Sequence, residues 1–344
     1  MKIDTGSVLK KFILLFVVLV VLHFSKAFLM PLVVGGIIAT LFIPFSNWLE
    51  KKRIPRGVAA LFSLLSLLLF LAAGVLLIAK EIANVTSDFE SIKQKGLERF
   101  AAAQQFIFDN LGIAFEKQSA LLSGEQISIT GMLQSVIGSV QYIFINLVLI
   151  LAYTFFLLYY RNHLKTFVLQ LVEQHLRRDL EKVMYKTARV AQQYLFGLSK
   201  MIGLLWLMYG IGFAAIGVDN FIFFAILCGF LEIIPFIGNI TGTSLTFLVV
   251  FLNGGSTAQL IGVLAVYGTV QFIQGWFIEP LILGPQVKIN PLFTIVALLL
   301  GEIIWGIPGV FVAIPVTAML KIIFDHVESL QPYGFLMGKI EKEK

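Results

Sequence analysis

The chain has 344 residues, of which 58% are hydrophobic and only 13% are charged. A soluble protein keeps roughly a quarter of its residues charged because its surface faces water, so this composition excludes an ordinary soluble domain. The net charge of +6 does not indicate a nucleic-acid partner, because the Lys and Arg residues flank the apolar segments, as the positive-inside rule predicts. The single cysteine, Cys228, excludes an internal disulfide.

The N-terminal part, residues 1–56, is predicted to form a transmembrane hairpin followed by a basic turn. One apolar segment covers about residues 8–24 and a second covers about residues 27–48. We prefer two retained spans to a cleaved signal peptide, because cleavage near Ala27 would leave another span as the mature start. The turn at residues 50–56 has four basic residues against one acidic residue, so it is expected in the cytoplasm together with the N-terminus.

Residues 57–160 are predicted to contain a third and a fourth span, joined by a polar stretch at residues 81–130. This stretch has four Lys or Arg residues against seven Asp or Glu residues, so it is expected outside the cell. Apolar residues recur every three or four positions from Ile82 to Leu111, which predicts an amphipathic helix. That helix would lie along the membrane or on its own protein, and a contact between subunits is the alternative.

A basic stretch follows at residues 161–200, with eight Lys or Arg residues against three Asp or Glu residues. It is therefore expected in the cytoplasm, as is the tail at residues 322–344. An apolar stripe along residues 161–200 predicts an amphipathic helix that lies on anionic lipid headgroups.

Residues 201–321 are almost entirely apolar and are predicted to form a transport core. Two of its segments, residues 221–252 and 291–320, are longer than one span needs and contain helix-breaking residues, so each either crosses the membrane as a broken helix or folds back as a re-entrant segment. In lipid, a broken helix survives only where its freed backbone groups line a cavity or pack within protein. Gly/Pro-interrupted segments that occur in pairs indicate the binding region of a transporter.

A glutamate precedes the helix break in each of these two segments. A carboxylate at the bilayer centre costs about 2.5–3.5 kcal/mol on insertion scales and is a functional candidate by default. A structural role for both glutamates, at a packing kink or near the interface, is the alternative. The predicted site residues around the two breaks are Glu232, Pro235, Gly238, Glu302, Gly306 and Gly309. The secondary candidates, at the end of the span between the two segments, are Glu279, Gln271 and Gln274.

Three stretches carry a pattern typical of one known family, in the same order along the chain. They are residues 31–56, with three prolines, the last of them in the basic turn; residues 234–238, Ile-Pro-Phe-Ile-Gly; and residues 278–315, which begin Ile-Glu-Pro-Leu-Ile-Leu-Gly. The chain thereby resembles the autoinducer-two exporter (PerM-like) family of bacterial membrane transporters. It departs from the pattern at Asn239, where the family often has proline, and at Asn290, where histidine is common, which leaves the substrate open.

The resemblance implies an all-helical protein with about eight membrane segments, a homo-oligomer, and export of a small hydrophilic solute, with a quorum-sensing furanone as the named example. Some relatives are associated with sodium/proton antiport, in which Glu232, Glu302 or Glu279 would exchange a proton for a cation. The sequence has no zinc, nucleotide-binding or nucleophile-elbow motif, so neither an enzyme nor a metal or other cofactor is expected.

A passive scaffold is the remaining alternative, and the two broken, carboxylate-bearing segments argue against it. We therefore expect a multi-pass protein of a bacterial inner membrane with both termini in the cytoplasm. Its expected partners are a small solute or ion, membrane lipid and further copies of the chain.

Overall fold

The computed structural model describes residues 5–87, 105, 108–109, 129–232, 237–283 and 288–339. All regular elements among these residues are helices. Six of the described helices are long and apolar enough to cross a membrane. They cover Lys26–Lys51, Arg56–Leu76, Ile145–Gln170, Arg177–Ala215, Thr257–Ile282 and Ile307–His326. Shorter apolar helices accompany them, and the prediction of a polytopic, all-helical membrane protein is thereby confirmed.

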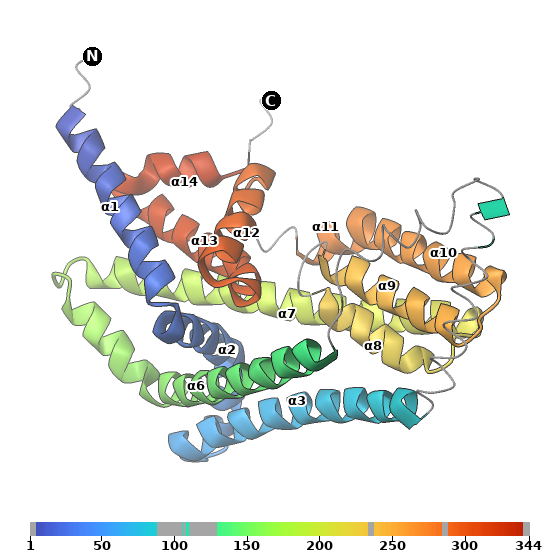
Figure 1. Ribbon diagram of the computed structural model, residues 1–344. Coiled ribbons are helices and arrows are strands. Elements are labelled where there is room, and N and C mark those ends of the chain that lie inside the picture. Colours follow the sequence, from blue (N-terminus) through green and yellow to red (C-terminus); the bar gives the residue numbers. More distant parts are fainter. Residues whose placement is uncertain are drawn as a thin grey trace. The chain divides into compact units, whose positions relative to one another are not determined.

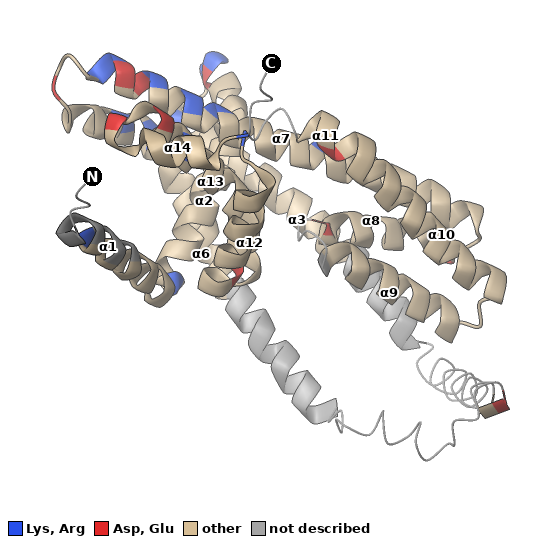
Figure 2. Cartoon of the chain, turned by 90° about the horizontal axis from the view of Figure 1, so that it is seen from above, with Lys and Arg blue, Asp and Glu red and all other residues tan. Residues whose placement is uncertain are grey.

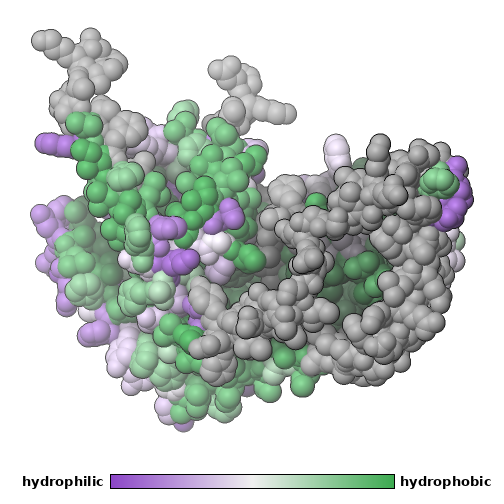
Figure 3. Space-filling model, in the orientation of Figure 1, coloured by the Kyte–Doolittle hydropathy of each residue, from purple (hydrophilic) through white to green (hydrophobic). Residues whose placement is uncertain are grey.

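The surface of the described part is apolar over wide areas, as a lipid-facing protein requires. Large side chains such as Phe24, Leu69 and Leu281 keep between 72% and 81% of their area exposed, and Figure 3 shows such hydrophobic areas. Charged side chains gather instead around the turn between two long helices, α6 (Ile129–Gln170) and α7 (Arg177–Ala215), as Figure 2 shows. A surface of this kind faces hydrocarbon along the helices and water at their ends.

The chain divides into two units. Unit 1 comprises Met1–Leu68, Ile145–Lys200 and Ile278–Lys344, and unit 2 comprises Leu69–Phe144 and Met201–Phe277. Three helices pass from one unit into the other, namely α3 (Arg56–Ser87), α6 and α7 (Figure 1). Neither unit is therefore a continuous piece of the sequence.

Unit 1 begins with α1 (Thr5–Phe24) and α2 (Lys26–Lys51), helices at the two predicted N-terminal spans. Small residues let α2 approach α6 closely, since the hydroxyl of Thr154 donates a hydrogen bond of 3.2 Å to the carbonyl oxygen of Gly35. The side chain of Gln192 on α7 donates to the carbonyl oxygen of Thr40, also on α2, at 3.0 Å. Helix α2 is thus held by hydrogen bonds to both long helices of its unit.

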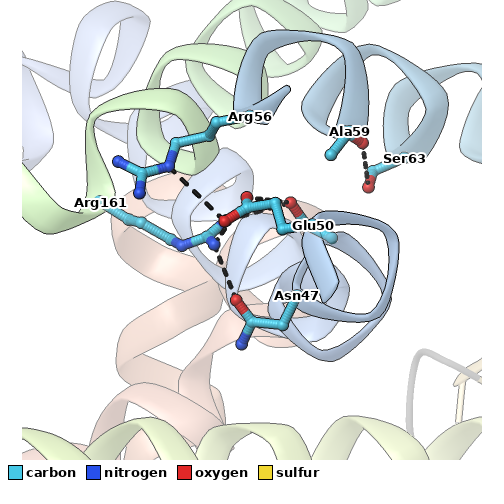
Figure 4. Close-up of polar contacts among 7 residues, drawn as sticks. Asn47, Glu50, Arg56, Ala59, Ser63 and Arg161 are labelled. Atoms are coloured by element: carbon cyan, nitrogen blue, oxygen red, sulfur yellow. Dashed lines mark hydrogen bonds and ion pairs between the residues drawn. The ribbon is translucent and has the colours of Figure 1, made fainter. Parts of the chain in front are cut away.

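A group of charged residues closes the end of α2 in unit 1. The guanidinium of Arg161 lies 2.7 Å from Oε1 of Glu50 and also donates to Ser46 at 3.0 Å and to Asn47 at 2.7 Å. Arg56, in the first turn of α3, lies 3.7 Å from the second oxygen of Glu50. Figure 4 shows how this carboxylate joins α2, α3 and α6. Because Arg161 and Glu50 are hydrogen-bonded to each other, this pair can be half-buried without leaving an unpaired charge. Nε of Arg56 is buried and has no hydrogen-bond partner among the described residues, so Arg56 contributes its charge alone.

The segment at residues 291–320 folds back on itself in unit 1. Helix α12 (Pro291–Trp305) ends at Gly306, and α13 (Ile307–His326) starts there and packs along α12 (Figure 1). Gly306 has φ 68° and ψ −145°, a conformation open essentially only to glycine. A Cβ atom at Gly309 would collide with the carbonyl oxygen of Gly301, so glycine also sets how closely the two helices pack.

The segment at residues 221–252 forms a second helical pair, in unit 2. Helix α8 (Phe221–Leu231) ends before the predicted break, and α9 (Ile237–Leu252) packs against α8. A capping box formed by Ser256 and Gln259 then starts α10 (Thr257–Ile273), which packs against α9. The five-residue π-helix η1 (Gln274–Ile278) and α11 (Glu279–Ile282) follow.

Helix α12 is tied to the C-terminal part of unit 1. Asn290 caps α12 by accepting a hydrogen bond of 2.9 Å from the backbone N–H of Phe293. Its side-chain amide donates to the carbonyl oxygens of Leu336 and Gly338, at 2.8 and 3.0 Å, beside α14 (Gln331–Met337). A short 3₁₀ helix, η2 (Glu328–Leu330), connects α13 to α14.

Two sequence-based predictions need comment. The amphipathic helix expected at residues 81–130 falls largely outside the described residues, which include only positions 81–87, 105, 108–109 and 129–130 of it. In the basic stretch at residues 161–200, α6 continues to Gln170, and α7 then runs without a break from Arg177 into the next apolar segment.

Gly309→Ala should destabilise the protein, because the new methyl group must push α12 and α13 apart. The expected cost is about 1–3 kcal/mol, as for overpacking of a core, and would lower the thermal unfolding midpoint in detergent. Gly268→Ala is the matched control, because a Cβ atom there meets nothing within 4 Å. Equal midpoints for the two variants would contradict the observed packing.

Candidate functional site

Five polar side chains meet inside unit 2 and form what we call the polar cluster. Its members are Tyr209 of α7, Glu232 at the C-terminal end of α8, Asn239 of α9, Gln271 of α10 and Gln274 of η1. All except Gln271 are at most 6% exposed. Burying polar groups in a membrane protein is costly unless they are hydrogen-bonded, so their clustering requires explanation.

Glu232 is the member that carries charge. It is the only charged residue from position 221 to position 278 of the sequence, which Figure 2 makes visible along α8, α9 and α10. The amide of Gln274 donates a hydrogen bond of 2.7 Å to Oε1 of Glu232. The C-terminal end of a helix repels negative charge, so this amide compensates an unfavourable position of the carboxylate at the end of α8.

The hydrogen bonds continue from Gln274 through the rest of the cluster. The amide nitrogen of Gln271 lies 3.3 Å from Oε1 of Gln274 and 3.3 Å from the hydroxyl oxygen of Tyr209. Asn239 in turn donates to Oε1 of Gln271 at 2.7 Å. One connected chain of side chains therefore joins α7, α8, α9, α10 and η1 within unit 2.

Local backbone features bring these residues together. Gln271 and Gln274 are three positions apart, so they lie on one face of their helix, and the π-helical turns begin at Gln274. Such π-bulges often occur at functional sites. A Cβ atom at Gly238 would collide with the carbonyl oxygen of Leu231, so only glycine lets the start of α9 approach the end of α8 this closely.

Asn239 keeps an acceptor that no described residue uses. Its oxygen Oδ1 is buried and accepts no hydrogen bond from the described part of the chain. A buried acceptor without a donor costs about 1–3 kcal/mol, a cost that a ligand with a hydroxyl, an amine or a positive charge would relieve. The cluster also borders Cys228, whose sulfur lies 3.8 Å from Oγ1 of Thr246.

The structure brings together three of the residues predicted from sequence, Glu232, Gln271 and Gln274, with Gly238 beside them. Glu302 is exposed at the end of α12 in unit 1, and it shares that helical pair with Gly306 and Gly309. Glu279 is exposed in α11, also in unit 1. Pro235 lies outside the described residues.

Sequence reasoning missed two members of the cluster. Tyr209 is one hydroxyl within an apolar helix, and no spacing distinguished it from a packing aromatic. Asn239 appeared only as a departure from the family pattern, although an amide in an otherwise apolar segment, next to the predicted break, was the available signal. Both were detectable only through their partners in space.

The groups of the cluster can hydrogen-bond a small polar molecule or coordinate a cation. The cluster has one carboxylate, three amides and one phenol, and the described residues contain no group of three His, Cys, Asp or Glu side chains that could hold a metal ion. Side-chain amides can both donate and accept hydrogen bonds, so the cluster can pair with either kind of group on a solute.

Gln274→Leu should destabilise the protein by about 1–3 kcal/mol, because it removes a donor from the buried carboxylate of Glu232. Combined with Glu232→Gln, the two changes should show a coupling free energy of about 0.5–3 kcal/mol in a double-mutant cycle of thermal unfolding. The exposed Gln193 provides the control: Gln193→Leu should change stability little and should be additive with Glu232→Gln. Additivity of the Gln274 and Glu232 changes would contradict the observed hydrogen bond.

Comparison with known proteins agrees with the resemblance. The model of the AI-2E family transporters matches residues 12–329. A protein of Synechocystis sp. named "Putative transport protein" is 29% identical, over 90% of this chain and 80% of its own length. "Putative transport protein YrrI" of Bacillus subtilis is 22% identical over 88% and 87% of the two chains, and YhhT of Escherichia coli, which bears the same description, is 20% identical over 96% and 94%. The chain belongs to the AI-2E transporter family, a family of membrane transporters and not of enzymes.

Proposed function

We propose that this protein is a secondary transporter that exports a small hydrophilic solute, and that the polar cluster of unit 2 forms part of its binding site. The observation that carries the proposal is the buried carboxylate of Glu232, which is hydrogen-bonded to Gln274 in an otherwise uncharged stretch of 58 residues. Intramembrane carboxylates mark solute or ion pathways. The position of Glu232, where α8 ends, also matches the broken segments that bind solutes in other transporters.

Cation/proton antiport is the second candidate, and the composition of the cluster favours it over other classes. Glu232 is the only carboxylate there, so one protonation event changes the charge of the whole cluster. A carboxylate binds either a proton or a cation, so the two can compete for the same group. Glu302, on α12 in unit 1, is a second predicted carboxylate.

We further propose that both helical pairs enter the membrane and return to the side they came from. The positive-inside rule gives cytoplasmic termini, a cytoplasmic turn at residues 171–176 and an external loop between α7 and α8. With α8 and α9 returning, residues 253–256 are external and residues 288–290 are cytoplasmic. We also propose that the protein lies in a bacterial inner membrane. We propose that it forms a homo-oligomer, because the family resemblance implies one.

Cysteine labelling tests this topology. In a Cys228→Ala background, Asn253→Cys should react with a membrane-impermeant maleimide from outside, and Lys288→Cys should react only after permeabilisation. Both positions are exposed. Asn253 is a better labelling position than Gly255 in the same loop, because a Cβ atom at Gly255 would collide with Val250. If α8 and α9 crossed the membrane as one span, the two labelling results would be exchanged.

Glu232→Gln should reduce transport while leaving the protein folded, because it keeps the shape and removes the charge. In proteoliposomes with imposed sodium or proton gradients, the loss in flux should be about tenfold or more, equivalent to at least about 1.4 kcal/mol. Flux would be followed with a pH-sensitive dye, labelled sodium and labelled furanone, because sodium-coupled pH changes without furanone movement would identify the antiporter.

The controls use the same chemical change elsewhere. Glu328→Gln alters an exposed glutamate of η2 and should transport at the parent rate. Glu302→Gln shows whether the second predicted carboxylate takes part. Parent-rate transport by Glu232→Gln with an unchanged pH dependence would place the site outside the polar cluster.

A further inference from the structure

A cavity of about 740 Å³ lies at the ends of three helices of unit 1, remote in sequence from the polar cluster. Its lining comes from α2, from the last part of α6 and from the first three turns of α7. The cationic side chains in it are Arg161, Lys165, Arg178 and Lys182. The anionic side chains are Glu50 and Glu181, so the lining has four positive charges against two negative charges.

One of the four cations, Arg178, forms no ion pair with the described residues, although its charge acts on the neighbouring carboxylate of Asp179. Arg161 is paired with Glu50, Lys165 with Glu181, and Lys182 with Asp179 at 2.9 Å. No carboxylate of the described residues lies within 4.0 Å of the guanidinium of Arg178. A guanidinium presents a planar set of donors that fits two oxygens of a phosphate group. The cavity therefore has the charge and the donor type for a phosphate ligand.

The rest of the lining consists of Asn47, Asn162 and Tyr185 and of three apolar side chains, Ile43, Met184 and Ala188, which extend along α2 and α7 away from Glu50 and Arg178. Ile43 precedes Glu50 by seven residues along α2, about 10 Å at 1.5 Å per residue. Met184 and Ala188 follow Arg178 by six and ten residues along α7, about 9 and 15 Å. A ligand that fills this cavity needs an anionic group at one end and hydrocarbon beyond it.

Aromatic side chains place the charged end of the cavity at the membrane interface. Trp48, next to the cavity residue Asn47, is 49% exposed, and Tyr160, next to Arg161, is 47% exposed. Exposed Trp and Tyr residues of membrane proteins gather at the level of the lipid headgroups. Lipid phosphates lie at the same depth, and the anionic lipids of the cytoplasmic leaflet attract basic side chains there.

We propose that this cavity binds one anionic phospholipid. Arg178 holds the headgroup phosphate, and Lys182, whose ion pair with Asp179 is exposed, adds a second contact to it. An acyl chain runs along Ile43, Met184 and Ala188. The apolar part of the lining and the interfacial depth favour a lipid over a free phosphate ion. The proposal uses the orientation proposed above only to select the leaflet and is independent of the transport site.

Native mass spectrometry of the full chain, released from mild detergent, tests the proposal. The probes are phosphatidylglycerol, phosphatidylcholine and inorganic phosphate, each titrated against the parent protein and two double variants. Arg178→Gln with Lys182→Gln removes two charges from the cavity. Arg177→Gln with Lys186→Gln removes two charges from the same helix at positions that do not line the cavity.

The expected result is one tightly retained phosphatidylglycerol on the parent chain and on the Arg177/Lys186 variant. The affinity of the protein for phosphatidylglycerol should fall roughly five-fold for each charge removed in the Arg178/Lys182 variant. Equal retention of phosphatidylcholine, or equal losses in the two double variants, would overturn the proposal in favour of unspecific lipid or diffuse surface charge. Displacement of the lipid by millimolar inorganic phosphate would overturn it in favour of a soluble anion.

Discussion

Hydrocarbon offers no hydrogen bonds, and this constraint decides where the chain can break its helices and where it can place polar groups. At each of the two breaks in the apolar core, the helix before the break packs against the helix after it, namely α8 against α9 and α12 against α13. Glycine lies where the two helices of each pair come closest. Glu232, the one charged residue in the sequence from 221 to 278, accepts a hydrogen bond from the amide of Gln274 on a different helix. Unit 1 follows the same rule at its end, where the carboxylate of Glu50 is shared by Arg161 and Arg56. These two carboxylates thus find their partners on other elements, and the partners hold the helices together.

Most of the fold could be predicted from sequence because hydropathy and helix breakers report directly on the bilayer. The apolar segments, the break before α9 and the break at Gly306 follow from single residues whose backbone preferences are strong. Whether a broken segment continues or returns depends on packing between its two halves, which no local pattern encodes. The fold-back of α12 onto α13 therefore appears only in the structure, where Gly301 and Gly309 cross.

The candidate site was predictable in part, for a related reason. Glu232 stands out because a charge in an apolar segment is conspicuous, and Gln271 and Gln274 share a helical face. Their mutual hydrogen bonds could not be foreseen, since α8 and α10 are connected only through α9. The sequence also predicted a part for Glu302, which lies in unit 1. Within unit 2, Glu232 is hydrogen-bonded to Gln274, and Gln274 to Gln271, the two glutamines that the sequence offered as secondary candidates. Asn239 and Tyr209 are recognisable as site residues only once those glutamines are in place.

The composition of the polar cluster has an electrical consequence. Its amides and phenol are neutral, so the cluster has a formal charge of −1 or 0 according to a single proton on Glu232. Moving one elementary charge across a membrane potential is worth about 2.3 kcal/mol per 100 mV. A cycle that exchanges one proton for a neutral solute is therefore electrogenic and draws on the membrane voltage, whereas exchange of one proton for one sodium ion is electroneutral and draws only on the two concentration gradients.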